Sequence, residues 1–173
     1  GEVMAAGYIA YRLKKLGLKP LPGNSSFLQE FTVRKRANPH ATEDSPDDVV
    51  LKGYNVVAMI NNQSENTVVI GAHFDHLGWG EAGGSLYVGE KAIHNGADDN
   101  ASGTAALIHL ADVLSKKKSN NNFVFIAFSG EEQGLWGSNY FTKNPELELD
   151  KVNYMLNMDM VGRLNEERKL SVN

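Results

Sequence analysis

Two continuous apolar runs separated by one helical stretch constrain this 173-residue chain more than any other feature. Thr67–Ile70 and Phe123–Phe128 lack the alternation of a half-exposed strand, so we expect both to be central strands covered on both faces. Between them, apolar residues recur at helical spacing across 103–117. A strand, a helix and a second strand make a parallel crossover unit, which predicts an α/β fold.

The remaining apolar patterns supply the outer parts of this fold. Residues 3–16 repeat at helical spacing, residues 27–36 alternate as in an outer strand, and a short helix is expected at about 134–141. Further strands are expected at 54–60 and at 152–158, the second of them buried. The predicted fold class is therefore α/β: a three-layer sandwich with a mixed, centrally parallel sheet.

Composition excludes several kinds of partner and chemistry. The formal net charge of −4 argues against nucleic acid or an anionic membrane as the main partner. No apolar run approaches the length of a transmembrane helix, so no membrane insertion is expected. The chain has no cysteine, which removes thiolate metal sites and cysteine nucleophiles.

Side chains that can bind metals stand where hydrophobic strands end or just before helices begin. They are His73, Asp75, Asp98, Glu131, Glu132 and Asp159, and Asp99 lies next to Asp98. Strand ends in an open α/β sheet point side chains into one crevice, so these residues should converge. Oxygen and imidazole ligands without thiolate suit zinc, and also cobalt or manganese. The pattern predicts a metal-dependent hydrolase with two metals.

The segment around His73 contains a hydrogen-bond partner for this histidine. A lone histidine is more often structural, but Asp75 lies two residues after His73 and can accept the free imidazole N–H, which would fix the tautomer. His76 should point to the opposite side from Asp75.

The two adjacent aspartates lie in a turn of small residues. One interpretation is a polar turn in which Asn100 or Ser102 caps the following helix. The other is a metal site, because small residues allow the close backbone approach that an acid bridging two cations needs. We favour Asp98 as a metal ligand and expect Asp99 to shape the backbone.

The later acids suggest a division of roles. Glu131 and Glu132 should point in different directions, so one can hold a metal while the other takes a proton from water. Asp159 lies among apolar residues, where an unpaired carboxylate is costly and a metal is the most economical partner.

Together these elements resemble metallopeptidase family 28, the co-catalytic two-zinc exopeptidases of the leucyl-aminopeptidase and glutamate-carboxypeptidase type. The matching segments are 71–78, 95–103, 128–134 and 157–160. The resemblance implies that Asp98 bridges two zinc ions and that the Asp98–Asp99 peptide is cis. It also implies that His73 and Asp159 bind one zinc and Glu132 the other.

The same resemblance implies further roles. Glu131 would be the general base and then the general acid, and Asp75 the hydrogen-bond partner of His73. The complete enzyme would hold two zinc ions, act on peptides with a free N-terminus and be secreted or periplasmic. The family's fifth ligand is a histidine well beyond the last acid, yet every histidine here precedes Asp159. We therefore expect residues 1–173 to be one catalytic domain, incomplete at both ends, that holds only one zinc and has weak activity.

Other interpretations stay open. A carboxypeptidase would need a cation for the substrate carboxylate, and Arg163 is a candidate. A glutaminyl-cyclase-like enzyme resembles a single-zinc variant, so the full ligand set favours a peptidase. A non-catalytic binding ectodomain with the peptidase fold would lack metal ligands, whereas this chain keeps His73, Asp98, Glu132 and Asp159. The insert 80–93, with Trp79, Leu86 and Tyr87, is either a wall of the substrate pocket or a surface loop.

Overall fold

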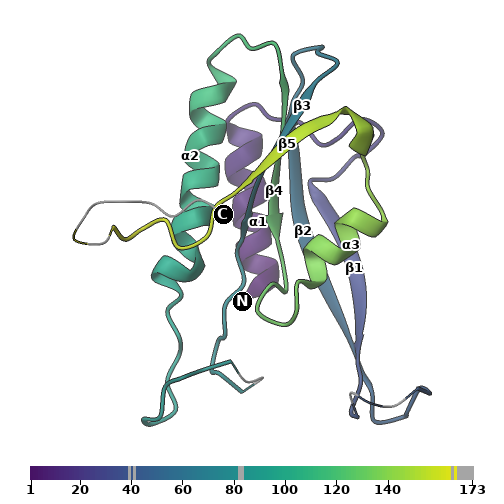
Figure 1. The fold of residues 1–173 in the computed structure, drawn as a ribbon, viewed down its shortest axis with the longest axis vertical. Helices are drawn as coiled ribbons and strands as arrows, with labels where there is room; N and C mark the ends of the chain where they lie inside the picture. The colour runs from purple at the N-terminus through teal and green to yellow at the C-terminus, as the bar shows by residue number, and fades with distance from the viewer. Residues whose placement is uncertain (39, 41, 82–83, 165, 167–173) are drawn as a thin grey trace.

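The computed structural model describes residues 1–38, 40, 42–81, 84–164 and 166. Five strands form one sheet in the order β1-β2-β4-β3-β5. β3 runs parallel to β4 and β5, whereas β2 runs antiparallel to β1 and β4. The strands are β1 Leu28–Lys35, β2 Val49–Ile60, β3 Thr67–His73, β4 Asn122–Phe128 and β5 Val152–Asn157. The predicted mixed sheet with a parallel centre is confirmed (Figure 1).

Helices cover both faces of the sheet, as the three-layer prediction requires. α1 (Glu2–Lys15) and α2 (Gly103–Ser115) pack on one face, where Leu13 and Leu107 belong to the larger core cluster. α3 (Trp136–Lys143) covers the other face, and its Phe141 belongs to the second cluster (Figure 1). Among the described residues, no helix combines the length and apolar character needed to cross a bilayer.

Burial of the strands agrees with the sequence in the centre of the sheet and differs at its edge. Every residue of β3 and β4 is buried, as their continuous apolar runs predict. The prediction that the last strand is buried is wrong, because Tyr154 is 61% exposed and Leu156 is 47% exposed. β5 is an edge strand, and within the described residues no helix covers these side chains.

The antiparallel hairpin is longer than the apolar pattern indicates. β2 begins at Val49 instead of the predicted residue 54, and Val49 pairs with Lys35 at the loop end of the hairpin. Four of the five added residues, from Val49 to Lys52, are exposed. No buried stripe therefore identifies them as strand residues in the sequence.

The parallel centre of the sheet determines where the metal-binding residues gather. His73 at the end of β3 pairs with Phe128 at the end of β4, and Gly71 pairs with Asn157 at the end of β5. The segments that follow β4 and β5 therefore leave the sheet at the same edge as His73.

Candidate metal centre

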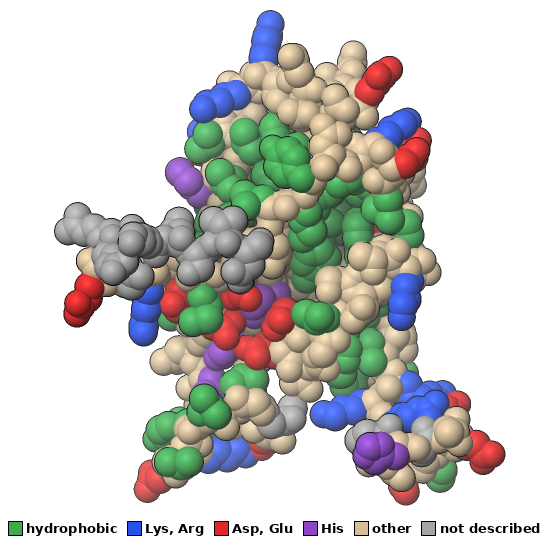
Figure 2. All heavy atoms as spheres, in the orientation of Figure 1, with side chains coloured by type: hydrophobic (Ala, Val, Ile, Leu, Met, Phe, Trp, Pro, Cys, Tyr) green, Lys and Arg blue, Asp and Glu red, His purple; other side chains and the backbone are tan. Residues whose placement is uncertain are grey.

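His73 is the centre of a compact group of carboxylates. Its side chain is 3% exposed, and its Nε2 lies 3.2 Å from Asp99 Oδ1 and 3.6 Å from Asp159 Oδ1. Glu131 Oε2 lies 3.9 Å from the same nitrogen. Figure 2 shows acidic and histidine side chains gathered on this face, above the projection at the lower left of the picture. Ligand atoms of His73, Asp99 and Asp159 lie within 4.8 Å of one another, which makes them a candidate metal site.

A second candidate site adjoins the first and shares one residue with it. His76, Asp99 and Glu132 also bring one ligand atom each within 4.8 Å of one another. Asp99 therefore belongs to both groups. A carboxylate has two oxygens, so this residue can bridge two cations.

The first group has the spacing that zinc requires. Two ligands at about 2.1 Å from zinc in a tetrahedral site are about 3.4 Å apart. The separations of 3.2 Å and 3.6 Å from His73 Nε2 to Asp99 and Asp159 lie on either side of that value. One imidazole and two carboxylates also form a donor set that zinc, cobalt and manganese accept.

The structure corrects the assignment of the two adjacent aspartates. Asp98 lies outside both groups: its Oδ1 accepts the Gly162 N–H at 2.9 Å and lies 3.3 Å from Ser102 Oγ. Asp99 takes the place predicted for Asp98. The cis peptide bond also lies one residue later than expected, between Asp99 and Asn100.

Asn100 explains why Asp99 turns toward the metal-binding edge. Asp99 and Asn100 have non-helical dihedral angles within the segment Ala97–Ser102. The buried Asn100 side chain donates to the Met158 carbonyl at 3.0 Å and accepts the Gly103 N–H at 3.0 Å. These bonds fasten the turn to the end of β5 and so hold Asp99 beside Asp159.

The sequence predicts Asn100 only as a possible cap of the helix that follows. Its bond to the Gly103 N–H agrees with that role, but its bond to the Met158 carbonyl crosses from one strand end to another. In the sequence, Asn100 follows two aspartates and precedes three small residues. This local pattern does not reveal that its side chain bonds to the distant Met158 carbonyl.

Asp75 fixes both neighbouring segments. His73 Nδ1 lies 3.2 Å from the backbone oxygen of Asp75, whereas the Asp75 carboxylate, the predicted acceptor of the imidazole N–H, is 3.6 Å away. The Asp75 carboxylate also accepts the backbone N–H groups of Glu131 at 3.0 Å and of Glu132 at 3.2 Å. It therefore sets where the glutamate pair begins, a role that the sequence did not indicate.

The surrounding charges change the pKa of two groups in the cluster. Burial lowers the pKa of His73, but the hydrogen bond and charge of Asp75, with the charges of Asp159 and Glu131, outweigh burial and raise it to about 9. Burial raises the pKa of Glu131, and its acidic neighbours add to this while His73 opposes it. A carboxyl group with a raised pKa is better suited to accept and return a proton near neutral pH.

A hollow of about 600 Å³ adjoins the cluster. Its lining includes Phe74, Asp75, His76, Gly130, Gln133 and Trp136. The insert 80–93 does not wall it with the expected side chains, because Leu86 is 97% exposed and Tyr87 and Trp79 are also largely exposed. The surface-loop interpretation fits these residues better. Residues 82–83 of the insert lie outside the described part of the chain.

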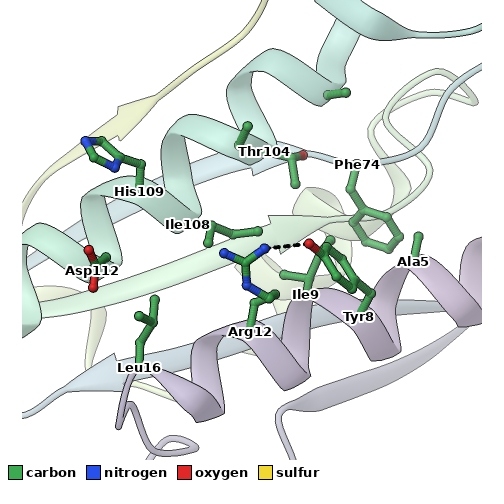
Figure 3. Close-up of a pocket in the computed structure, with 12 residues that line it drawn as sticks. Ala5, Tyr8, Ile9, Arg12, Leu16, Phe74, Thr104, Ile108, His109 and Asp112 are labelled. Atoms are coloured by element: carbon green, nitrogen blue, oxygen red, sulfur yellow. Dashed lines mark hydrogen bonds between the residues drawn. The ribbon is translucent and has the colours of Figure 1, made fainter.

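A separate groove of about 460 Å³ lies between α1 and α2 (Figure 3). Arg12 in this groove donates to the Tyr8 hydroxyl at 2.5 Å, and His109 and Asp112 come from α2. His109 is exposed on α2 and belongs to neither group of metal-binding side chains.

Comparison with known proteins identifies relatives that are similar in sequence. A probable leucine aminopeptidase from Trichophyton verrucosum is 37% identical over 64% of this chain and 29% of that protein. An aminopeptidase from Pseudomonas aeruginosa is 38% identical over 68% of this chain and 20% of that protein.

Solved structures share the fold at lower identity. A Zn-dependent exopeptidase from Parabacteroides distasonis has a TM-score of 0.72 at 22% identity, over 92% of this chain and 53% of that one. A glutaminyl cyclase from Porphyromonas gingivalis has a TM-score of 0.66 at 21% identity, over 90% of this chain and 51% of that one. The chain thus spans less than a third of these curated relatives and about half of these solved structures.

The sequence profile of peptidase family M28 matches residues 55–173, which is more than half of the chain and includes every member of both candidate metal groups. The chain therefore belongs to peptidase family M28.

Proposed function

We propose that the protein containing this chain is a zinc-dependent exopeptidase, and specifically an aminopeptidase that uses two cations. The observation that carries this proposal is Asp99, the one residue common to both groups of metal-binding side chains. Relatives at 37% and 38% identity that are named aminopeptidases support the choice of reaction.

Each side chain of the cluster then has a role. His73, Asp99 and Asp159 would hold one zinc ion, and Asp99 and Glu132 would hold the other. Bound zinc would act as a Lewis acid toward the substrate carbonyl and lower the pKa of a bound water.

Glu131 is the proposed general base. Its Oε2 lies 3.9 Å from His73 Nε2, so the carboxylate borders the first group without belonging to it. It would accept a proton from the attacking water and donate it to the leaving amine. The pKa of Glu131 is raised mainly by burial, which supports this exchange. Asp75 would hold the backbone of Glu131 in place through the bond to its N–H.

Two related reactions are less well supported. Glutaminyl cyclases share the fold at 20–22% identity, so the fold does not separate them from peptidases. A second group built around Glu132 favours the peptidase, because by resemblance the cyclases are single-zinc variants. For a carboxypeptidase, Arg163 is 86% exposed and lies 3.9 Å from Asp98 Oδ2, so nothing here aims it at a substrate carboxylate.

The test uses the full-length protein loaded with zinc and two matched substrates, an aminoacyl p-nitroanilide and its N-acetylated form. We expect hydrolysis of the free-amine substrate alone, loss of that activity with a chelator, and recovery with zinc. Cyclisation of an N-terminal glutaminyl peptide is measured in parallel. Equal hydrolysis of both anilides, or cyclisation without hydrolysis, would contradict the proposal.

A further inference from the structure

We propose that His76 is a positioning residue for the second cation and holds the Glu132 carboxylate through its Nδ1–H. This inference rests on the proposed two-cation function and adds to it a residue that the family resemblance does not assign. It also corrects the expectation that His76 points away from the site.

The contact between the two side chains has the length of a hydrogen bond. His76 Nδ1 lies 2.7 Å from Glu132 Oε1, and both side chains are largely buried. Two ligands of one zinc ion would be about 3.4 Å apart, as His73 and its two carboxylate partners nearly are. A carboxylate can only accept, so the hydrogen lies on Nδ1 and His76 is the donor.

The imidazole of His76 is confined from two sides. Gly96 has a φ of +60°, and a Cβ at this position would lie 2.8 Å from His76 Cγ, so only glycine lets the turn approach the ring. The His94 ring stands edge-on at 6.2 Å. The His94 backbone N–H donates to the Gly78 carbonyl at 2.7 Å, and the ring nitrogen Nε2 of His94 lies 3.1 Å from Ser85 Oγ.

His76 and Asp75 together fix the two ends of Glu132. The Asp75 carboxylate accepts the Glu132 backbone N–H at 3.2 Å, while His76 binds one oxygen of the side chain. The other carboxylate oxygen would remain available to a cation, and Glu132 would lose fewer rotamers when it binds one. Partners of this kind around a metal ligand contribute about 10–100-fold in metal affinity.

The test compares three variants of the full-length protein by chelator competition with zinc and by the visible spectrum of the cobalt-loaded protein. We expect His76→Ala to weaken the second cation about 10–100-fold and to leave the first unchanged. His76→Asn should restore affinity to within a few-fold, because its amide nitrogen can donate from the position of Nδ1. His109→Ala, exposed on α2, is the matched control and should equal the wild type.

Each outcome bears on the proposal. Retained affinity at the first site shows that the His76→Ala protein is folded. Unchanged affinity at the second site would overturn the inference. An Asn variant as weak as the Ala variant would also overturn it, because a direct zinc ligand and not a hydrogen-bond donor would then be missing. A wild-type protein that binds no second cation would overturn the two-cation function itself, and this inference with it.

Discussion

Glu131 and Glu132 are adjacent in the chain yet contact different partners. Glu132 bonds to His76 and belongs to the second metal group, whereas Glu131 approaches His73 without belonging to either group. This difference supports the proposed roles, in which Glu132 binds metal and Glu131 transfers the proton.

The residue to substitute is therefore Glu131. In Glu131→Gln the amide keeps the size of the side chain but cannot accept the proton, so we expect kcat to fall about 10²–10⁴-fold. Zinc content should stay at the wild-type value, as measured by elemental analysis of the same sample. Full activity, or loss of zinc in step with activity, would contradict the assignment of Glu131 as the base.

We expect zinc binding at the first site to depend on pH through His73. Its pKa is raised to about 9, so without metal the imidazole is protonated at neutral pH and must lose that proton to bind zinc. The apparent affinity of the first site should therefore rise about tenfold per pH unit well below pH 9 and more slowly near it, or about 50-fold from pH 7 to 9. Calorimetry in buffers of different ionisation enthalpy should show about one proton released per zinc at pH 7. A pH-independent affinity would contradict this.

At the scale of elements, the kinked turn before α2 is the part that holds the centre together. Asn100 is buried, and its side chain bonds to the Met158 carbonyl and to the Gly103 and Met160 N–H groups. Asn100→Ala leaves these backbone groups unsatisfied and should cost about 2–3 kcal/mol in the free energy of unfolding. It should also weaken zinc binding, because Asp99 loses its support. Asn139→Ala, on an exposed part of α3, is the control and should change neither the denaturation midpoint nor the zinc titration.

Elements with strong local patterns could be predicted, and those defined by tertiary contacts could not. The buried runs that became β3 and β4 fixed the centre of the sheet and thereby the edge where His73, Glu132 and Asp159 meet. The choice between Asp98 and Asp99 depends on backbone angles that the Asn100 contacts determine, so no local pattern encodes it. The exposure of β5 depends equally on what else covers the sheet.

The direction of the His76 side chain also could not be predicted from a local pattern, because His76 lies beyond the end of a strand. Alternation of side chains predicts opposite directions for adjacent residues only while the chain stays extended, and β3 ends at His73. Beyond that point Asp75 and His76 both turn toward the Glu131–Glu132 segment.

Across the whole molecule, the cluster concentrates negative charge at one edge of the sheet. Its carboxylates belong to Asp75, Asp99, Glu131, Glu132 and Asp159. Cations that bind only the folded protein stabilise it by mass action, by about 2.7 kcal/mol at 100 times the dissociation constant. Zinc should therefore raise the melting temperature, and a chelator should lower it.

Without metal, stability should fall as pH rises from 6.5 to 9. His73 has its pKa raised from 6.5 to about 9 on folding, so its contribution is complete below 6.5 and is lost as pH rises through 9. The raised pKa of Glu131 acts in the same direction, because the folded state holds that proton to higher pH than the unfolded state. Urea denaturation of the chelator-treated protein across this range checks the sign. An increase in stability toward pH 9 would contradict it.

The most direct measurement is a zinc titration of Asp99→Asn beside Asp98→Asn in the full-length protein. Asp99 belongs to both metal groups, whereas Asp98 bonds to Gly162 outside them. We predict that Asp99→Asn weakens both cations by about 100-fold or more, while Asp98→Asn binds two with wild-type affinity. Loss of both cations in Asp98→Asn with retention in Asp99→Asn would contradict the shared-ligand centre described here.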